Sequence, residues 1–267
     1  MLTTQELEKT KPTVIQTRNL EELSLIRLSQ VQAVIYHPDK LPDWFSDLSV
    51  AVKDCSFRVP RTIIEDASRR TIEKRLHADL PSVGIAPGVR KALIEDMLSL
   101  VDLCGDLASA ETFRARYLTN SPNPDCGYHV DTAPADAPAQ GLLRVYCGTG
   151  TEYPHPSRIT SLIDFYIYVY RREQLTRRMA RALKKGGLEE HRRTFAERSK
   201  LDEAPPFLRK PQQIERVPAG CIVAMKYANS RFLWSEHLSC ARAGGWIHRS
   251  PMKGGEPRFL VNINACR

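Results

Sequence analysis

Three histidines in this sequence are each followed, two positions later, by an aspartate, a spacing that can supply two ligands to one metal ion. In a strand, residues i and i+2 share a face, so both side chains of a His-x-Asp pair point the same way, whereas in a helix they diverge. Seven histidines and 31 acidic residues in 267 positions give fewer than one such pair by chance, so the surrounding sequence must discriminate. The pairs are His37/Asp39, His77/Asp79 and His129/Asp131.

The local sequence favours the third pair. His37-Pro-Asp39 stands between an expected strand and an expected helix, where the aspartate suits a helix cap. His77-Ala-Asp79 ends a segment with helical spacing, so its two side chains diverge. His129-Val-Asp131 follows an expected strand at 113–118 and a loop rich in Pro and Asn, which predicts a position at the rim of a β-structure.

A third ligand is expected from a late strand, and His248 is the best candidate. It lies in Gly244-Gly-Trp-Ile-His-Arg-Ser-Pro251, and Arg258 follows it by ten residues on the last expected strand. Two imidazoles and one carboxylate on one side of a metal ion form the ligand set of non-haem Fe(II) sites, which leave positions open for substrate and oxygen. The other candidates are His155 in a Pro-containing loop, His191 in a charged segment and His237 after an acidic and aromatic turn.

The elements that must position these side chains change character at residue 112. Residues 1–111 are expected to be mainly helical, irregular over 1–25, with helical spacing at 62–78 and 88–107. After residue 111 the apolar period becomes 2, which is typical of a sandwich or barrel, interrupted by a basic and helical insertion at 172–203. Besides 31–36, strands are expected at 113–118, 141–147, 164–170, 213–217, 220–225 and 258–264.

Read in order, His129-x-Asp131, a gap of 119 residues to His248, and then Arg258 resemble the pattern of the 2-oxoglutarate/Fe(II)-dependent dioxygenase superfamily. The resemblance covers about residues 112–265 and implies an α+β protein whose core is a double-stranded β-helix, or jelly roll. It implies that the two histidines and the aspartate hold Fe(II) and that Arg258 binds the distal carboxylate of 2-oxoglutarate. It points to a bacterial branch of the superfamily and brings no substrate with it.

Two features depart from the family pattern, and two other interpretations stay open. The gap between the histidines is long, and Leu260 stands where some members carry a serine after the arginine. One alternative is a zinc protein of the same fold, in metal sensing or homeostasis, in which Cys126 or Cys147 joins the ligands, because thiolates favour zinc. In the other, His129 and His248 are ordinary hydrogen-bonded side chains beside turns.

Net charge and composition limit the kinds of molecule that the protein is expected to bind. The formal net charge is +8, and residues 171–210 carry nearly all of the excess, with 13 Lys/Arg against 6 Asp/Glu. Aromatic side chains that stack on bases are nearly absent there, so a solvated helical face is favoured over a nucleic-acid contact. The neighbouring Arg114, Arg116 and Arg144 are candidates for neutralising an acidic cosubstrate or substrate. Tyr166, Tyr168 and Tyr170 would share one face of a strand.

The cellular setting is expected to be the cytoplasm. The sequence has no run of 18 apolar residues, and its first residues lack the basic and apolar regions of a signal peptide. Its seven scattered cysteines include no Cys-x-x-Cys pair, which argues against a disulfide framework and a zinc ribbon.

Overall fold

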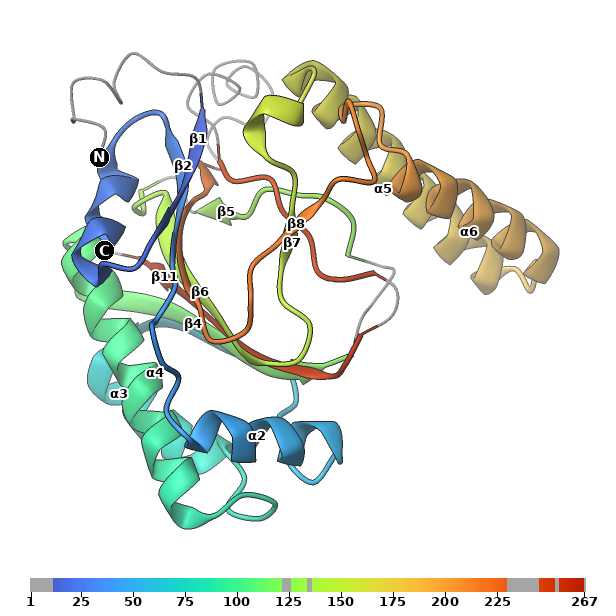
Figure 1. Ribbon diagram of the computed structural model, residues 1–267. Helices are drawn as coiled ribbons and strands as arrows, with labels where there is room; N and C mark the ends of the chain where they lie inside the picture. Colours follow the sequence, from blue (N-terminus) through green and yellow to red (C-terminus); the bar gives the residue numbers. More distant parts are fainter. Residues whose placement is uncertain (1–11, 122–125, 134–135, 230–244, 253–254, 267) are drawn as a thin grey trace.

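The centre of the molecule is a seven-stranded mixed sheet, shown in Figure 1. The computed structural model describes residues 12–121, 126–133, 136–229, 245–252 and 255–266. Of the six neighbouring strand pairs, β1 and β2 run parallel and the other five run antiparallel. In sheet order the strands are β1 (Thr13–Thr17), β2 (Val31–Tyr36), β9 (Ile222–Lys226), β6 (Gln140–Cys147), β11 (Arg258–Ala265), β4 (Thr112–Asn120) and β3 (Thr62–Ser68).

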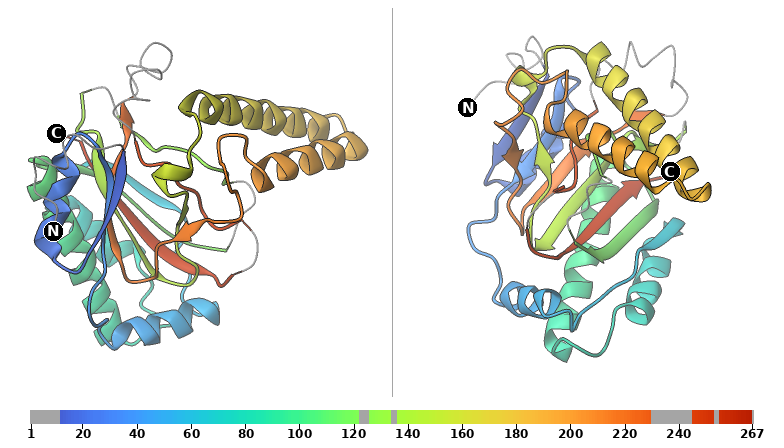
Figure 2. Two further views of the ribbon diagram at one scale, coloured as in Figure 1. Left: turned by 45° about the horizontal axis from the view of Figure 1, so that its top comes forward. Right: turned by 90° about the vertical axis from the view of Figure 1, so that its right-hand side faces the viewer.

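Helices cover one face of this sheet, as Figure 2 shows. They are α2 (Trp44–Lys53), α3 (Arg69–Asp79) and α4 (Pro87–Ala108), with a 3-10 helix, η1 (Leu20–Arg27), beside β2. Apolar side chains recur along α4 at intervals of three and four, so one side of the helix faces the sheet. They pack with alternate residues of β11, namely Phe259, Val261 and Ile263.

The opposite face of the sheet carries the remaining elements. The intervening residues of β11 point there, and Leu260 joins a second apolar cluster that contains Trp246 and Met225. Two short strand pairs lie beyond this cluster: β5 (Thr132–Ala133) with β10 (Ala228–Asn229), and β7 (Glu152–Tyr153) with β8 (Glu215–Arg216). A further 3-10 helix, η2, spans Pro156–Arg158.

Two long helices, α5 (Leu162–Lys184) and α6 (Leu188–Glu203), form a hairpin that projects away from the sheet in the left view of Figure 2. We call this hairpin the arm. It contains the basic segment 172–203, but the strand expected at 164–170 is wrong, because these residues are the first turns of α5. The Ser161 side chain caps the helix by accepting from the Asp164 backbone N–H, and Phe165 and Tyr168 are buried at helical spacing.

The N-terminal part supplies strands as well as helices. Irregular structure was the expectation for 1–25, yet β1 and most of η1 lie there; residues 1–11 are outside the described residues. A helix was expected over 62–78, but its first seven residues are β3. The register of β3 shifts between Ile64 and Ala67, and Asp66 has a φ of 43°, so this bulge mimics helical spacing.

The strands expected at 31–36, 113–118, 141–147, 220–225 and 258–264 are confirmed, and the one at 213–217 shortens to the two residues of β8. The division at residue 111 stays a prediction, although β1, β2 and β3 belong to the same sheet as β4 and β11. The chain is a mixed α+β protein. Within the described residues, every helix is too short or too polar to span a bilayer.

Candidate metal centre

His129, Asp131 and His248 lie together, with one potential ligand atom from each within 4.8 Å of the others. The Nε2 atom of His129 lies 3.6 Å from Oδ1 of Asp131, and Nε2 of His248 lies 3.7 Å from Oδ2. The aspartate is therefore shared between two imidazoles. Among the described residues, no other group of three His, Cys, Asp or Glu side chains is this compact.

The backbone brings the two histidines side by side. His129 donates its N–H to the carbonyl of His248 at 2.9 Å, and His248 donates back at 3.0 Å, so the pair forms a two-residue antiparallel bridge. Their ring centroids are 4.6 Å apart. Asp131 continues the first segment, with its carbonyl accepting from Ala228 at the start of β10. The shared face of His129 and Asp131 follows from their i, i+2 spacing in this extended segment.

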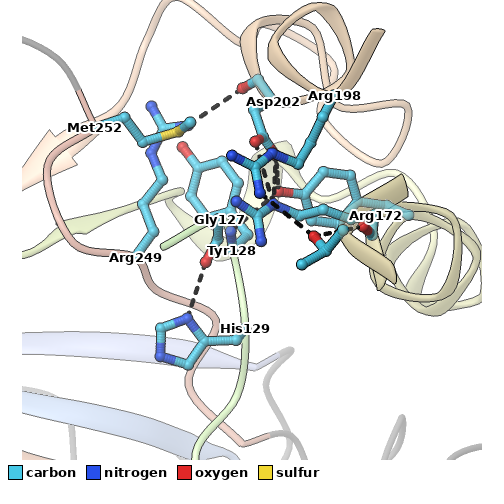
Figure 3. Close-up of polar contacts among 10 residues, drawn as sticks. Gly127, Tyr128, His129, Arg172, Arg198, Asp202, Arg249 and Met252 are labelled. Atoms are coloured by element: carbon cyan, nitrogen blue, oxygen red, sulfur yellow. Dashed lines mark hydrogen bonds and ion pairs between the residues drawn. The ribbon is translucent and has the colours of Figure 1, made fainter. Parts of the chain in front are cut away.

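Both imidazoles are oriented by the same kind of backbone contact. Nδ1 of His129 lies 2.9 Å from the carbonyl oxygen of Gly127, the contact drawn in Figure 3. Nδ1 of His248 lies 3.0 Å from the carbonyl oxygen of Trp246. Since a carbonyl only accepts, Nδ1 carries the proton and Nε2 presents its lone pair toward Asp131. This arrangement of a metal-binding histidine, one nitrogen held and the other free to ligate, is the usual one.

Electrostatics keep these groups in ligating forms. Burial lowers the pKa of His248 to about 4, and nearby His129 acts in the same direction, so the imidazole is neutral at neutral pH. Burial opposes ionisation of Asp131, but the positive charges around it, those of Arg116 and Arg114 among them, hold the carboxyl pKa below its ordinary value.

One side of the cluster is open. The His248 side chain is 7% exposed and the Asp131 side chain 19%, whereas that of His129 is 40% exposed. The ring of Trp246 stacks on His248 with the centroids 4.6 Å apart and covers the closed side. A metal ion held by the three side chains would thus be reachable by further ligands from the His129 side.

The arm contacts the residues next to both histidines, as Figure 3 shows. Asp202 of α6, whose side chain is 1% exposed, accepts from the Tyr168 hydroxyl at 2.6 Å and from Arg172 Nε at 2.9 Å. The same Tyr168 hydroxyl accepts from the backbone N–H of Tyr128 at 3.0 Å. Arg249 donates to the carbonyl of Asp202 at 3.2 Å. Asp202 is therefore the hub between the arm and both metal-centre segments.

Further contacts hold the residues next to the two histidines in place. The Arg249 guanidinium lies 4.3 Å from the ring centroid of Tyr128 and donates to Glu152 of β7 at 2.9 Å. Gly127 lets the arm approach, because a Cβ there would lie 2.0 Å from Arg172 Nε. Sequence reasoning missed these positioning residues. Tyr128 and Arg249 are detectable only as neighbours of the ligands, and nothing in the sequence marks Asp202.

Arg258, expected as the cosubstrate residue, is 2% exposed at the start of β11. Its guanidinium donates to Asn120 Oδ1 at 3.0 Å, Ser250 Oγ at 2.6 Å and the Thr149 carbonyl at 3.4 Å. All three partners are neutral, and none of the described residues pairs a carboxylate with it. Burial lowers the pKa of Arg258 to about 10. Ser250 stands two residues after His248, so the arginine is linked to the segment that carries the second histidine.

The other candidate side chains have other partners. Arg144 makes two hydrogen bonds to the carboxylate of Asp96 on α4, at 2.7 and 2.8 Å, so its role is structural. His155 accepts from Ser157 in η2. Asp39 pairs with Arg18 at the surface instead of capping α2. His191 lies in α6, outside the cluster, and His237 falls outside the described residues.

Neither cysteine proposed as a zinc ligand joins the cluster. Cys147 is buried, and burial raises the pKa of its thiol to about 11, which disfavours the thiolate that zinc needs. Cys126 precedes Gly127 but offers no ligand atom to the group. Tyr168 and Tyr170 do not share a strand face: they lie on α5, the first buried and the second exposed.

Comparison with known proteins gives only distant similarities. No protein-family model matches the chain, and no curated protein matches it. Solved structures that resemble it include the dioxygenase for auxin oxidation from rice, 15% identical with a TM-score of 0.46, covering 96% of this chain and 83% of that one. The dioxygenase for auxin oxidation 1 from Arabidopsis thaliana, solved with 2-oxoglutarate, is 10% identical with a TM-score of 0.43, covering 95% and 92%.

A prolyl-4-hydroxylase from Pseudomonas putida is 12% identical with a TM-score of 0.37, covering 92% of this chain and 99% of that one. These similarities are too low to decide the function, which therefore has to be argued from the site itself.

Proposed function

We propose that this protein is a non-haem Fe(II) oxygenase that uses 2-oxoglutarate, built on a double-stranded β-helix. The observation that carries the proposal is the convergence of His129, Asp131 and His248, with both Nδ1 atoms held by carbonyls and both Nε2 atoms facing one carboxylate. Two imidazoles, one carboxylate and an open side match the facial arrangement of such iron sites. The ligand set contains no thiolate, which removes the main reason to prefer zinc.

The strand arrangement agrees with such a core. A large sheet lies on one side of the site, and the short pairs β5/β10 and β7/β8, with the bridge between His129 and His248, lie on the other. The inward residues of β11 and β4 face the space between them.

Arg258 supports 2-oxoglutarate as the cosubstrate. A buried guanidinium is costly without a counter-ion, and its partners in the described residues are neutral. A carboxylate ligand would supply the missing charge through a charge-assisted, two-pronged pair. Together, Fe(II) and 2-oxoglutarate would activate molecular oxygen, which is the oxidant: one oxygen atom would go to the succinate formed with loss of carbon dioxide, and the other to the hydroxylated C–H bond of the substrate. The chain itself holds the ligands, orients the cosubstrate through Arg258 and excludes water on the side covered by Trp246.

The experiment is Arg258→Ala, with 2-oxoglutarate titrated calorimetrically into Fe(II)-loaded protein without oxygen. Losing a buried charge pair costs about 2–5 kcal/mol, so the affinity should fall by at least about 30-fold. Metal content should stay unchanged, because Arg258 contacts none of the three ligand side chains. Arg258→Lys keeps the charge but loses the planar fork and should give an intermediate affinity.

Two controls make the result decisive. Arg192→Gln changes an exposed arginine of α6 and should leave the affinity for 2-oxoglutarate unaltered. His129→Ala should lose the metal. Succinate formation with Fe(II) and ascorbate gives an independent readout for the wild type. Wild-type protein that binds metal but no 2-oxoglutarate would contradict the oxygenase proposal, and an unaltered affinity in Arg258→Ala would remove this arginine from the site.

A further inference from the structure

A polar pocket of about 80 Å³ borders the candidate metal centre at Asp131. Among the described residues, only polar and charged side chains line it: Arg114, Arg116, Asp131, Thr132, Asn262 and Asn264. Two cations and two amides beside a single carboxylate make the pocket suitable for an anion. If a metal ion takes up the charge of Asp131, the surplus of positive charge grows.

The sheet places these residues in register. On antiparallel β4 and β11, Asn262 pairs with Arg116 and Asn264 pairs with Arg114. Their side chains share the face opposite to the helices, because the alternate residues of both strands pack in the helix-side core. Each arginine thus has an amide as its direct cross-strand neighbour.

Arg116 is the unsatisfied member of the group. Its Nε atom is buried and has no hydrogen-bond partner among the described residues. Arg114, by contrast, pairs with Glu65 of β3 at 3.1 Å. Buried donors are almost always satisfied in native proteins, so an unpaired one in a cavity indicates a missing acceptor. An anionic ligand at Arg116 would meet this requirement.

Tyr227 orients the side-chain amides of Asn262 and Asn264, which also line the pocket. Its hydroxyl donates to Asn264 Oδ1 at 2.7 Å and accepts from Asn262 Nδ2 at 3.3 Å. The first bond uses the carbonyl oxygen of Asn264 and leaves its amide nitrogen as a donor for a ligand. The hydroxyl fits only because residue 141 is glycine, since a Cβ there would lie 2.3 Å from it.

This pocket is separate from Arg258. Asn264 lies six positions after Arg258 on β11, which corresponds to about 20 Å along a strand. Arg258 is not among the residues that line the pocket, and Leu260 lies between Arg258 and Asn262 on the same strand face. The pocket, not Arg258, shares Asp131 with the metal centre.

We propose that this pocket binds a carboxylate group of the substrate, with the Arg116 guanidinium as the principal contact and the Asn264 amide as a second donor. A planar guanidinium fork matches a planar carboxylate. The assignment of this ligand to a substrate rests on the proposed function, because only the metal centre beside it makes the bound molecule a reactant. The substrate class is therefore a carboxylic acid.

The test follows the Arg116 Nε and Asn264 side-chain amide resonances by NMR while butyrate is added to the protein, with and without Zn²⁺. Butyramide is the neutral matched probe and inorganic phosphate the competing oxyanion. Butyrate should shift both resonances saturably and butyramide should not. Arg116→Gln should weaken butyrate binding, read from Asn264, by about 10- to 100-fold, the loss of one charge-assisted bond.

Control variants locate the effect. Arg258→Gln and the exposed Arg192→Gln should leave the butyrate shifts at Arg116 unchanged, and Arg116→Lys should bind with intermediate affinity. Thermal unfolding checks that each variant is folded, and the lysine variant keeps the test available if the glutamine variant is not. The proposal would be overturned if butyrate shifted neither resonance, if Arg116→Gln bound butyrate with the same affinity as the wild type, or if only phosphate produced a response.

The two proposals fail separately, because this test needs neither iron nor turnover. If butyrate binds at Arg116 but the protein takes up no 2-oxoglutarate, the carboxylate pocket stands and the oxygenase proposal falls. If 2-oxoglutarate is consumed but butyrate never reaches Arg116, the pocket proposal falls alone.

Discussion

Helix α4, which covers the sheet, and helix α6 of the arm are held by different kinds of contact. α4 buries nine residues, all apolar, against the sheet. The buried residues of α6 are Thr194, Arg198 and Asp202, and none of them is apolar. α6 is anchored by hydrogen bonds and an ion pair that converge on Asp202, whereas α5 also packs Phe165 and Tyr168 in an apolar cluster with Ile247.

This difference in contacts indicates that one helix mainly supports the stability of the fold and the other mainly supports the geometry of the site. Apolar burial is non-directional and supports the fold as a whole. A buried ionic hub contributes little net stability but fixes orientation, since each hydrogen bond demands a particular geometry. We therefore expect changes in α4 to alter the free energy of unfolding, and changes at Asp202 to alter the metal centre.

The largest expected effect is that of Leu93→Ala on α4. Leu93 is fully buried, so removing its side chain should lower the free energy of unfolding by about 2–5 kcal/mol. Urea denaturation measures the loss, and metal affinity of the folded protein should stay unchanged. Val83→Ala, at a side chain 77% exposed, is the matched control with almost no effect. A loss below about 1 kcal/mol would mean that the helical layer is not the main source of stability.

The intermediate effect is that of Asp202→Asn. It removes the negative charge of the carboxylate that accepts from Arg172 Nε, so we expect a stability loss of about 1–3 kcal/mol. Metal affinity should fall by roughly 10- to 100-fold, the usual cost of disturbing residues that orient metal ligands. Zn²⁺ titration against a competing chelator measures it. Glu173→Gln, in an exposed pair with Arg177, is the control; an Asp202→Asn protein with wild-type metal affinity would show that the arm does not position the centre.

The smallest effect is expected on the solvent side of the arm. Replacing exposed Lys184, Lys185 and Arg192 by glutamine should change the free energy of unfolding by no more than about 0.5 kcal/mol each and leave metal affinity unaltered. Binding to duplex DNA at two salt concentrations is measured in parallel. If wild-type protein bound DNA in a salt-dependent way and this variant did not, the arm would be a nucleic-acid contact in addition to a structural hairpin.

The sequence was informative where local pattern and tertiary environment agree. β4 and β11 alternate between residues for the helix-side core and residues for the site, and this alternation is visible in the sequence. The three clustered side chains could be selected because strand geometry gives His129 and Asp131 a common face. That these residues bind metal stays a prediction.

Elsewhere, contacts between residues far apart in the sequence override the local secondary-structure propensity. Residues 164–170 are rich in aromatic and β-branched side chains and alternate as a strand would, yet Tyr168 bonds to Asp202, 34 residues away, and the segment is helical. In β3 the bulge at Asp66 changes the spacing of the buried residues from two to three. The local sequence indicates neither the contact with Asp202 nor the bulge in β3.

The position of β11 has a consequence for the order in which the molecule assembles. β11 lies between β6 and β4, both of which precede it in the chain, so neither strand has its shared neighbour until residues 258–265 exist. The bridge between His129 and His248 likewise joins segments 119 residues apart. Such non-local closure is slow and late in folding. In a nascent chain, His129 and His248 therefore cannot form this bridge until residue 248 has been made.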